Sequence, residues 1–146
     1  MNSEFETLLS GQLFKKLYDK RCILITEKYG LHKVEIEILL FLKKGKLDTA
    51  RDIVEARHYS KAHISHAIEH LMEQGYVVGQ MDAQDRRCIH LKLTEEAEPV
   101  CQQLIKLRRS LMKTVYKDVT EEEMLILKQV AKKVAHNINA ELMNEI

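Results

Sequence analysis

The feature that most constrains the fold is a pair of short helical patterns followed at once by a strand-like alternation. The two patterns cover residues 49–57 and 60–74, so only a few residues separate them. After Gly75 the period changes, because residues 76–78 and 88–93 read as two short strands around a polar turn. This order predicts a helix-turn-helix followed by a β-hairpin, which is the winged form of that motif.

The second helical pattern is specified at both ends and along one face. Ser60 is a favourable N-cap, and Gly75 stands where helices commonly end. The inner stripe of this helix consists of Ile64, Ile68, Leu71 and Met72. The outer face near its start is therefore left to Lys61, Ala62, His63, Ser65 and His66.

Helical patterns precede this central part. Residues 4–29 place apolar side chains at steps of three and four, the spacing of one helical face, and Gly30 then ends the pattern. The next segment, residues 32–42, is so rich in isoleucine and leucine that we expect it to be buried on more than one side. The stripe of the first helix consists of Phe14, Tyr18, Cys22, Ile25 and Tyr29.

The chain is helical again from Thr94, after the hairpin. Pro99 removes a backbone donor near the start of this region, which predicts a kink or a late helix start. Thr120 and Glu123 form a capping box that opens the final helix. The two C-terminal helices carry apolar stripes, at Leu104, Leu107, Leu111 and Val115 in the first and at Met124, Leu127, Ala131, Val134, Ile138 and Leu142 in the second. We therefore expect a mainly α fold with a small β-hairpin wing.

We expect a single domain over residues 1–146, with a winged-helix lobe at 31–94 and a helical dimerisation region at 1–30 and 95–146. The lobe can close a small core by itself, whereas the stripes of the flanking helices have no third layer to cover them. The alternative is that the N- and C-terminal helices pack only on each other and on the winged lobe. We favour a homodimer, because a two-fold axis also presents two reading helices to a pseudo-palindromic DNA site.

Charge favours DNA binding only locally. The formal net charge is +1, and residues 47–93 carry 6 basic against 7 acidic side chains, so the overall balance does not indicate nucleic acid. The same stretch holds 5 histidines, which titrate near neutral pH and can add positive charge beside phosphate. We therefore expect an affinity for DNA that depends on salt and on pH. These histidines are His58, His63, His66, His70 and His90.

Two surfaces have the residue types that DNA contact needs. Short polar side chains at the start of a recognition helix reach base edges and phosphates in the major groove. At the hairpin tip an arginine suits the narrow minor groove, and Asp85 can hold it in an extended pose. Arg51 suits a phosphate contact, and a surface salt bridge is an equally good interpretation of it. For the recognition helix and the hairpin tip, the alternative is an ordinary solvated surface. The predicted DNA-contacting residues are Arg51, Ser60, Lys61, His63, Ser65, His66, Asp85, Arg86 and Arg87.

The order of these elements and the residues themselves resemble the MarR family (multiple antibiotic resistance regulators). The match runs from Leu31 to Thr94, and the helical arms fit the family's dimerisation region. The residues that carry it are those at 60–65, 71–77, 85–87 and 91–94. The resemblance implies a homodimeric repressor or activator, with the 60–74 helix in the major groove and the 81–87 wing in the minor groove of double-stranded DNA. It also implies that a small ligand, metal or oxidant alters the affinity.

Two positions depart from the family's pattern. The family often has glycine shortly after the Leu-Thr pair, where this chain has residues 95–99, and often has arginine where His66 stands. The second departure bears on base specificity more than on the fold.

The resemblance offers several kinds of effector. Redox-sensing members use a cysteine in the first helix, but Cys22 lies in the apolar stripe, where a buried inert thiol is the commoner outcome. The helical spacing of His63, His66 and His70 suits a metal less well than a DNA-facing or solvated surface, so we expect no metal and no cofactor. The remaining candidate is a small molecule in the crevice between arms and lobe, near Tyr18 and Tyr29.

Other classes of function lack their motifs. No glycine-rich phosphate loop, zinc-protease motif, nucleophile elbow or paired carboxylates are present, so we do not expect an enzyme. A winged-helix adaptor for protein contacts remains the alternative, but it would carry an apolar patch where this chain has the Arg86–Arg87 tip. Three cysteines without a CxxC pair, no basic-then-apolar leader and no long apolar run lead us to expect a cytoplasmic protein without a membrane contact.

Overall fold

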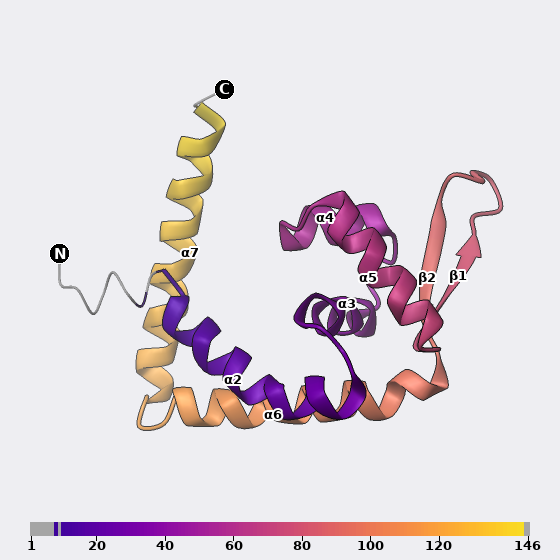
Figure 1. Ribbon diagram of the computed structural model, residues 1–146. Coiled ribbons are helices and arrows are strands. Elements are labelled where there is room, and N and C mark those ends of the chain that lie inside the picture. Colours follow the sequence, from indigo (N-terminus) through magenta and orange to yellow (C-terminus); the bar gives the residue numbers. More distant parts are fainter. Residues whose placement is uncertain (1–7, 9, 145–146) are drawn as a thin grey trace. The chain divides into compact units, whose positions relative to one another are not determined.

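The computed structural model describes residue 8 and residues 10–144 (Figure 1). The chain divides into two compact units at residue 111, within one helix. The elements in chain order are α2 (Gln12–Tyr29), α3 (Lys33–Lys44), α4 (Ala50–Arg57), α5 (Lys61–Glu73), β1 (Val77–Met81), β2 (Ile89–Leu93), the 3-10 turn η1 (Glu95–Ala97), α6 (Glu98–Val115) and α7 (Glu121–Asn144). The mainly α fold with a two-stranded hairpin is therefore confirmed.

Glycines set the ends of the first two helices of the first unit. Gly11 is left-handed, with φ of 67°, and α2 begins directly after it at Gln12, so the helix expected over residues 4–29 is interrupted at this glycine. Residues 4–7 and 9 lie outside the described residues. Gly30 is also left-handed and its N–H bonds back to the carbonyl of Thr26, which confirms the predicted end of the helix. The next helix, α3, runs to Lys44, slightly beyond the expected residue 42.

Side-chain caps fix the helix-turn-helix formed by α4 and α5. The Thr49 hydroxyl accepts the backbone N–H of Asp52 at 3.2 Å, and the Asp52 carboxylate accepts the Thr49 N–H at 3.1 Å. The Thr49 hydroxyl also donates a hydrogen bond to the Asp52 carboxylate, and this bond lowers the pKa of Asp52. Ser60 accepts the N–H of His63 at 3.1 Å, and Gly75 follows α5 with a φ of 81°. Both ends of the predicted recognition helix are thus where the sequence places them.

The hairpin pairs β1 with β2 in antiparallel register, with Val77 opposite Leu93 and Gly79 opposite Leu91. The first strand was expected over 76–78 and extends to Met81, so the turn between the strands is shifted to 82–88. Gly79 permits this close packing, because a Cβ there would lie 2.9 Å from a methyl carbon of Ile89.

The core lies between α3, α4, α5, the hairpin and the first half of α6. The helix α3 is buried on several sides, as predicted, and it contributes more buried residues to the core than any other element. The side chains that are fully buried there include Ile36, Ile38, Leu39, Ile53, Ile64, Leu71, Val77, Val100 and Leu104. From α2, Cys22 and Ile25 join the same core.

Pro99 is accommodated by a late helix start and not by a kink. The residues Glu95–Ala97 form a 3-10 turn, and α6 begins at Glu98, so the proline lies in the first turn where its missing N–H has no intrahelical partner to lose. The Glu98 carboxylate binds the Lys43 ammonium at 2.6 Å and joins the start of α6 to the end of α3.

The second unit consists mainly of α7. The predicted capping box is present: the Thr120 N–H donates to Glu123 at 2.8 Å, and the Glu123 N–H donates to the Thr120 hydroxyl at 3.2 Å. All residues of α7 are described and none of them is buried. The large apolar side chains that it leaves exposed are Leu125, Ile126, Leu127, Val130, Ile138, Leu142 and Met143.

Among the described residues, no helix combines the length and the apolar character that crossing a membrane would require.

Candidate nucleic-acid interface

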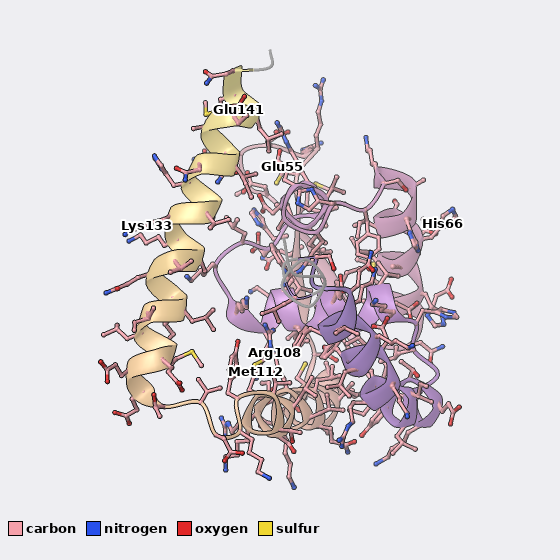
Figure 2. The ribbon with its side chains drawn as sticks, turned by 90° about the vertical axis from the view of Figure 1, so that its left-hand side faces the viewer. Glu55, His66, Arg108, Met112, Lys133 and Glu141 are labelled. Carbon is pink, nitrogen blue, oxygen red and sulfur yellow. The ribbon has the colours of Figure 1, made fainter. Side chains whose placement is uncertain are left out.

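The outer face of α5 gathers polar side chains over a buried stripe. Ile64, Ala67, Ile68 and Leu71 are buried, and the side chains between them at the start of the helix are exposed. Figure 2 shows His66 pointing outward from this helix. The structure therefore leaves Lys61, His63, Ser65 and His66 exposed around the outer side of the first turns of α5.

Two residues at the start of α5 have structural partners as well. The Ser60 hydroxyl already accepts the N–H of His63, so its own proton remains available to an outside acceptor. The His63 ring meets Tyr59 edge to face, with the ring centroids 5.2 Å apart. The cap and the aromatic contact hold this exposed end of the helix in one conformation.

His70 was expected on the same outer surface, and that expectation is wrong. Its Nδ1 contacts Oε1 of Glu35, a carboxylate that is only 2% exposed. The other oxygen of Glu35 accepts the N–H of His32 at the start of α3. The acid is buried because it meets both partners, and it joins the N-terminus of α3 to the C-terminal half of α5.

The turn of the wing is held by its own aspartates. Asp82 accepts the backbone N–H groups of Gln84 and Asp85 at 3.0 and 2.9 Å. Asp85 accepts the N–H of Arg87 at 3.0 Å, so it fixes the backbone of the arginine, whereas we expected it to hold the side chain. Arg86 and Arg87 are both exposed at the tip.

The ring of His90 is held between two aspartates of the lobe. Its Nδ1 lies 2.7 Å from Oδ1 of Asp48, and its Nε2 lies 2.9 Å from Oδ1 of Asp82. These hydrogen bonds, first to Asp48 and then to Asp82, raise the pKa of His90, and the bond to His90 lowers the pKa of Asp82. The histidine expected to add charge beside phosphate is thus engaged within the protein.

Arg51 lies in the first turn of α4 with its side chain 87% exposed. Its Nε is 3.2 Å from Glu55, one turn further along the helix. An exposed pair of this kind contributes little to stability. The structure therefore keeps both interpretations of Arg51, the phosphate contact and the surface salt bridge.

A cavity of about 250 Å³ opens in the first unit between α2, α3 and α6. The stacked rings of Phe14 and Tyr18, 6.3 Å apart, form one wall. The remaining lining residues are Lys15, Lys33, Glu37, Leu40, Arg57 and Arg108. Tyr29 was expected here, but it does not line this cavity and accepts a hydrogen bond from Gln103 instead.

The three cysteines, all in the described part of the chain, are unpaired. Cys22 is 5% exposed, and burial raises the pKa of its thiol, which agrees with the interpretation of a buried, unreactive group. Between residues 10 and 144, no group of three or more histidine, cysteine or acidic side chains is placed to hold a metal ion.

The sequence matches known proteins in the region of the helix-turn-helix and the hairpin. A family model described as a winged helix DNA-binding domain matches residues 31–97. The HTH-type transcriptional repressor MdtR of Bacillus subtilis (strain 168) is 26% identical over 109 residues, which cover 75% of this chain and 70% of that protein.

Solved structures resemble the fold over most of the chain. A MarR protein from Peptoclostridium difficile DA00132 has a TM-score of 0.80 at 19% identity, covering 100% of this chain and 94% of that chain. A MarR-family transcriptional regulator from Listeria monocytogenes complexed with 26mer DNA has a TM-score of 0.79 at 19% identity, covering 92% of this chain and 89% of that chain. At this identity the likeness establishes the fold, which is that of winged-helix proteins.

Proposed function

We propose that this chain is a MarR-family winged-helix transcription regulator, and that it acts as a cytoplasmic, ligand-responsive repressor whose homodimer binds a pseudo-palindromic duplex. The family is one of regulators and not of enzymes. Repression is proposed because the curated relative is itself a repressor. The cytoplasm is proposed because three unpaired thiols suit a reducing compartment.

The observation that carries the DNA-binding proposal is the pairing of two exposed surfaces on one lobe. The outer face of α5 presents Lys61, Ser65 and His66, which suit base edges and phosphates in the major groove. The wing presents Arg86 and Arg87 on a turn that its aspartates fix, and an arginine of this kind suits a narrow minor groove. We propose that α5 and the 81–87 wing read adjacent grooves of one half-site.

The dimer proposal rests on apolar side chains that the chain leaves uncovered. Leu24 of α2 is 77% exposed, and α7 has no buried residue in spite of its apolar side chains. Exposed apolar surface of this extent on two helices calls for a partner. We propose that residues 1–30 and 95–146 supply the dimer interface and residues 31–94 the DNA-binding lobe, as one functional domain over residues 1–146.

The effector proposal rests on the cavity beside Phe14 and Tyr18. Its lining holds four cationic side chains against the single carboxylate of Glu37. The Nε of Arg57 is buried there and has no hydrogen-bond partner within the described part of the chain. A small aromatic anion would stack on the tyrosine and phenylalanine rings and would pair with that guanidinium. We propose this class of molecule as the effector.

Binding to DNA is tested by selection from a random pool of duplexes about 30 base pairs long, which has room for two half-sites about one helical turn apart. Fluorescence anisotropy then compares the selected duplex with a scrambled one. His66→Ala is expected to reduce the discrimination, because a good base contact contributes about 1–3 kcal/mol. His136→Ala, an exposed histidine of α7, is the matched control. Failure to bind any duplex at low salt would instead favour the adaptor function.

The dimer is tested by light scattering coupled to gel filtration. The proposal predicts twice the mass of one chain for the wild type and a monomer for Leu127→Glu/Ile138→Glu, which places charges on the exposed stripe. A monomeric wild type at micromolar concentration would contradict it.

The effector site is tested by calorimetry with benzoate as the probe. Benzoate is expected to bind and benzamide, which has the same ring without the charge, is expected not to bind. Arg57→Leu is expected to abolish the binding of benzoate. Equal binding of the two compounds would refute the anion preference.

A further inference from the structure

One cluster of side chains in the winged lobe lies outside the core and includes none of the predicted DNA-contacting residues. It consists of His90 in β2, Asp48 in the loop before α4, and Asp82 at the start of the wing turn. Through it, one imidazole ring joins two segments that are 34 residues apart in the sequence, 48 and 82. We call this cluster the wing anchor.

The geometry of the wing anchor sets the protonation state of the ring. Both ring nitrogens lie within hydrogen-bond distance of a carboxylate oxygen, at 2.7 and 2.9 Å. A carboxylate can only accept, so each nitrogen must carry a proton, and only the imidazolium form has two N–H groups. In the neutral ring one nitrogen would turn a lone pair towards a carboxylate, and one of the two interactions would become repulsive.

The charged groups around the ring favour the cation. At the ring itself the acids are the two partners, Asp48 and Asp82, and around Cys88, two residues earlier in the chain, Asp52 of α4 and Asp85 of the wing join them. After burial, the four aspartates raise the pKa of the Cys88 thiol, which shows that the local field is negative. On the same face of β2 the neighbouring cation is Lys92, with an exposed side chain, and β1 offers only the uncharged Gln80 opposite His90.

The wing anchor acts where the hairpin has few other attachments to the lobe. The Leu91 N–H donates to the Asp48 carbonyl at 2.8 Å, which ties the inner part of β2 to the loop before α4. Nearer the tip of the hairpin than Leu91, the strand residues Met81 and Ile89 are exposed, and so are Arg86 and Arg87 in the turn. The side chain of Asp82 both binds His90 and accepts the N–H groups that shape this turn.

We propose that His90 is a positioning residue for DNA binding: as an imidazolium between Asp48 and Asp82 it fixes the direction of the wing, so that raising the pH releases the wing and weakens binding. The proposal rests on the DNA-binding function proposed above. Since the pKa of His90 is raised in the folded protein, the anchor is complete below the ordinary histidine pKa of about 6.5 and is lost as the pH rises through the raised value.

The first test needs no DNA. Proton and nitrogen NMR of the free protein follow the titration of His90, and amide hydrogen exchange follows residues 82–88. We expect a doubly protonated ring with a pKa above the ordinary value, which falls in Asp48→Asn and in Asp82→Asn. Exchange in the turn should become faster above that pKa. An ordinary pKa for His90, or one that neither variant moves, would overturn the proposal even if the protein binds DNA.

The second test measures affinity for the selected duplex from about pH 6 to about pH 9 at constant ionic strength. A wing in its binding pose for between half and a tenth of the time weakens affinity about two- to ten-fold. His90→Gln should show this loss of affinity already at low pH, and its affinity should no longer change with the titration of residue 90. Lys44→Gln, at an exposed residue of α3 outside the proposed interfaces, is the control, and Asp82→Asn keeps an acceptor for the turn if His90→Gln is unstable. A wild-type pH profile in His90→Gln would overturn the proposal.

The two tests separate the failure of this proposal from the failure of the proposed function. If no variant binds DNA while His90 titrates as expected, the anchor stands and the DNA-binding function fails. If DNA binds with a pH dependence that disappears in His63→Gln/His66→Gln and persists in His90→Gln, the exposed histidines carry it and the positioning role of His90 is refuted.

Discussion

Replacing Glu35 with alanine should destabilise the lobe by disconnecting the recognition helix from α3. The carboxylate is 2% exposed and has partners on both sides: the His32 N–H, 2.6 Å from Oε2, and Nδ1 of His70 on α5. Alanine removes both interactions at once. It also leaves the first turn of α3 without a partner for one of its N–H groups.

The size of the effect follows from the kinds of interaction that alanine removes. A hydrogen bond to a charged group contributes about 1.5–3 kcal/mol, and a buried polar group left without a partner costs about 1–3 kcal/mol. The side chain of His70 is 33% exposed, so water can solvate it after the mutation and reduce the loss. We therefore expect the free energy of unfolding to fall by about 2–4 kcal/mol for Glu35→Ala, and by about 1–2 kcal/mol for Glu35→Gln, whose amide oxygen still accepts from His32.

Urea unfolding followed by circular dichroism measures this difference, at one protein concentration because a dimer's stability depends on it. A double-mutant cycle with His70→Ala isolates the coupling between the two side chains. Glu27→Ala, an exposed acid of α2, is the matched control. A loss below about 1 kcal/mol for Glu35→Ala, or no coupling to His70, would refute the account of this ion pair.

Three further predictions concern the core, the thiols and the last helix. Leu104→Ala should lower the free energy of unfolding by about 2–5 kcal/mol, because the side chain is fully buried, whereas the exposed Leu47→Ala should change it by less than about 0.5 kcal/mol. A thiol reagent should label Cys88 first, because it is only half-buried, and should label Cys22 and Cys101, which are 5% and 0% exposed, only on unfolding; mass spectrometry after timed labelling measures the order. Thr120→Ala should cost α7 about 1 kcal/mol by removing its N-cap, and it should speed amide exchange in the first turn of α7 more than elsewhere.

Local signals predicted the ends of the elements well. Ser60 and Gly75 delimit α5, and Gly30 ends α2, because a cap or a left-handed turn is a property of a few neighbouring residues. The interruption of the predicted 4–29 helix at Gly11 was missed. The apolar spacing continues through Gly11, and spacing alone does not reveal that this glycine adopts a left-handed conformation that interrupts the helix.

The roles of the histidines were predicted less well. His63 and His66 are exposed on α5, and the sequence could place them there from the helical period alone. His70 and His90 instead meet acids that are far away in the sequence, Glu35 and Asp48. Such pairs depend on which elements pack together, so a local sequence pattern does not predict them. The cavity is similar, because Tyr18 lines it and Tyr29 does not, although both lie on the same predicted stripe.

The measurement that tests the central claim most directly is the affinity for the selected duplex over a salt series, for the wild type and for Arg86→Ala/Arg87→Ala. The account predicts tight binding of the wild type that weakens steeply with salt. In the double variant it predicts weaker binding and a shallower slope of log K against log salt, by about 0.9 for each phosphate that the protein no longer neutralises. Lys132→Ala/Lys133→Ala, two exposed cations of α7, is the control for charge alone. Absence of binding at low salt, or a double variant that binds like the wild type, would contradict the account.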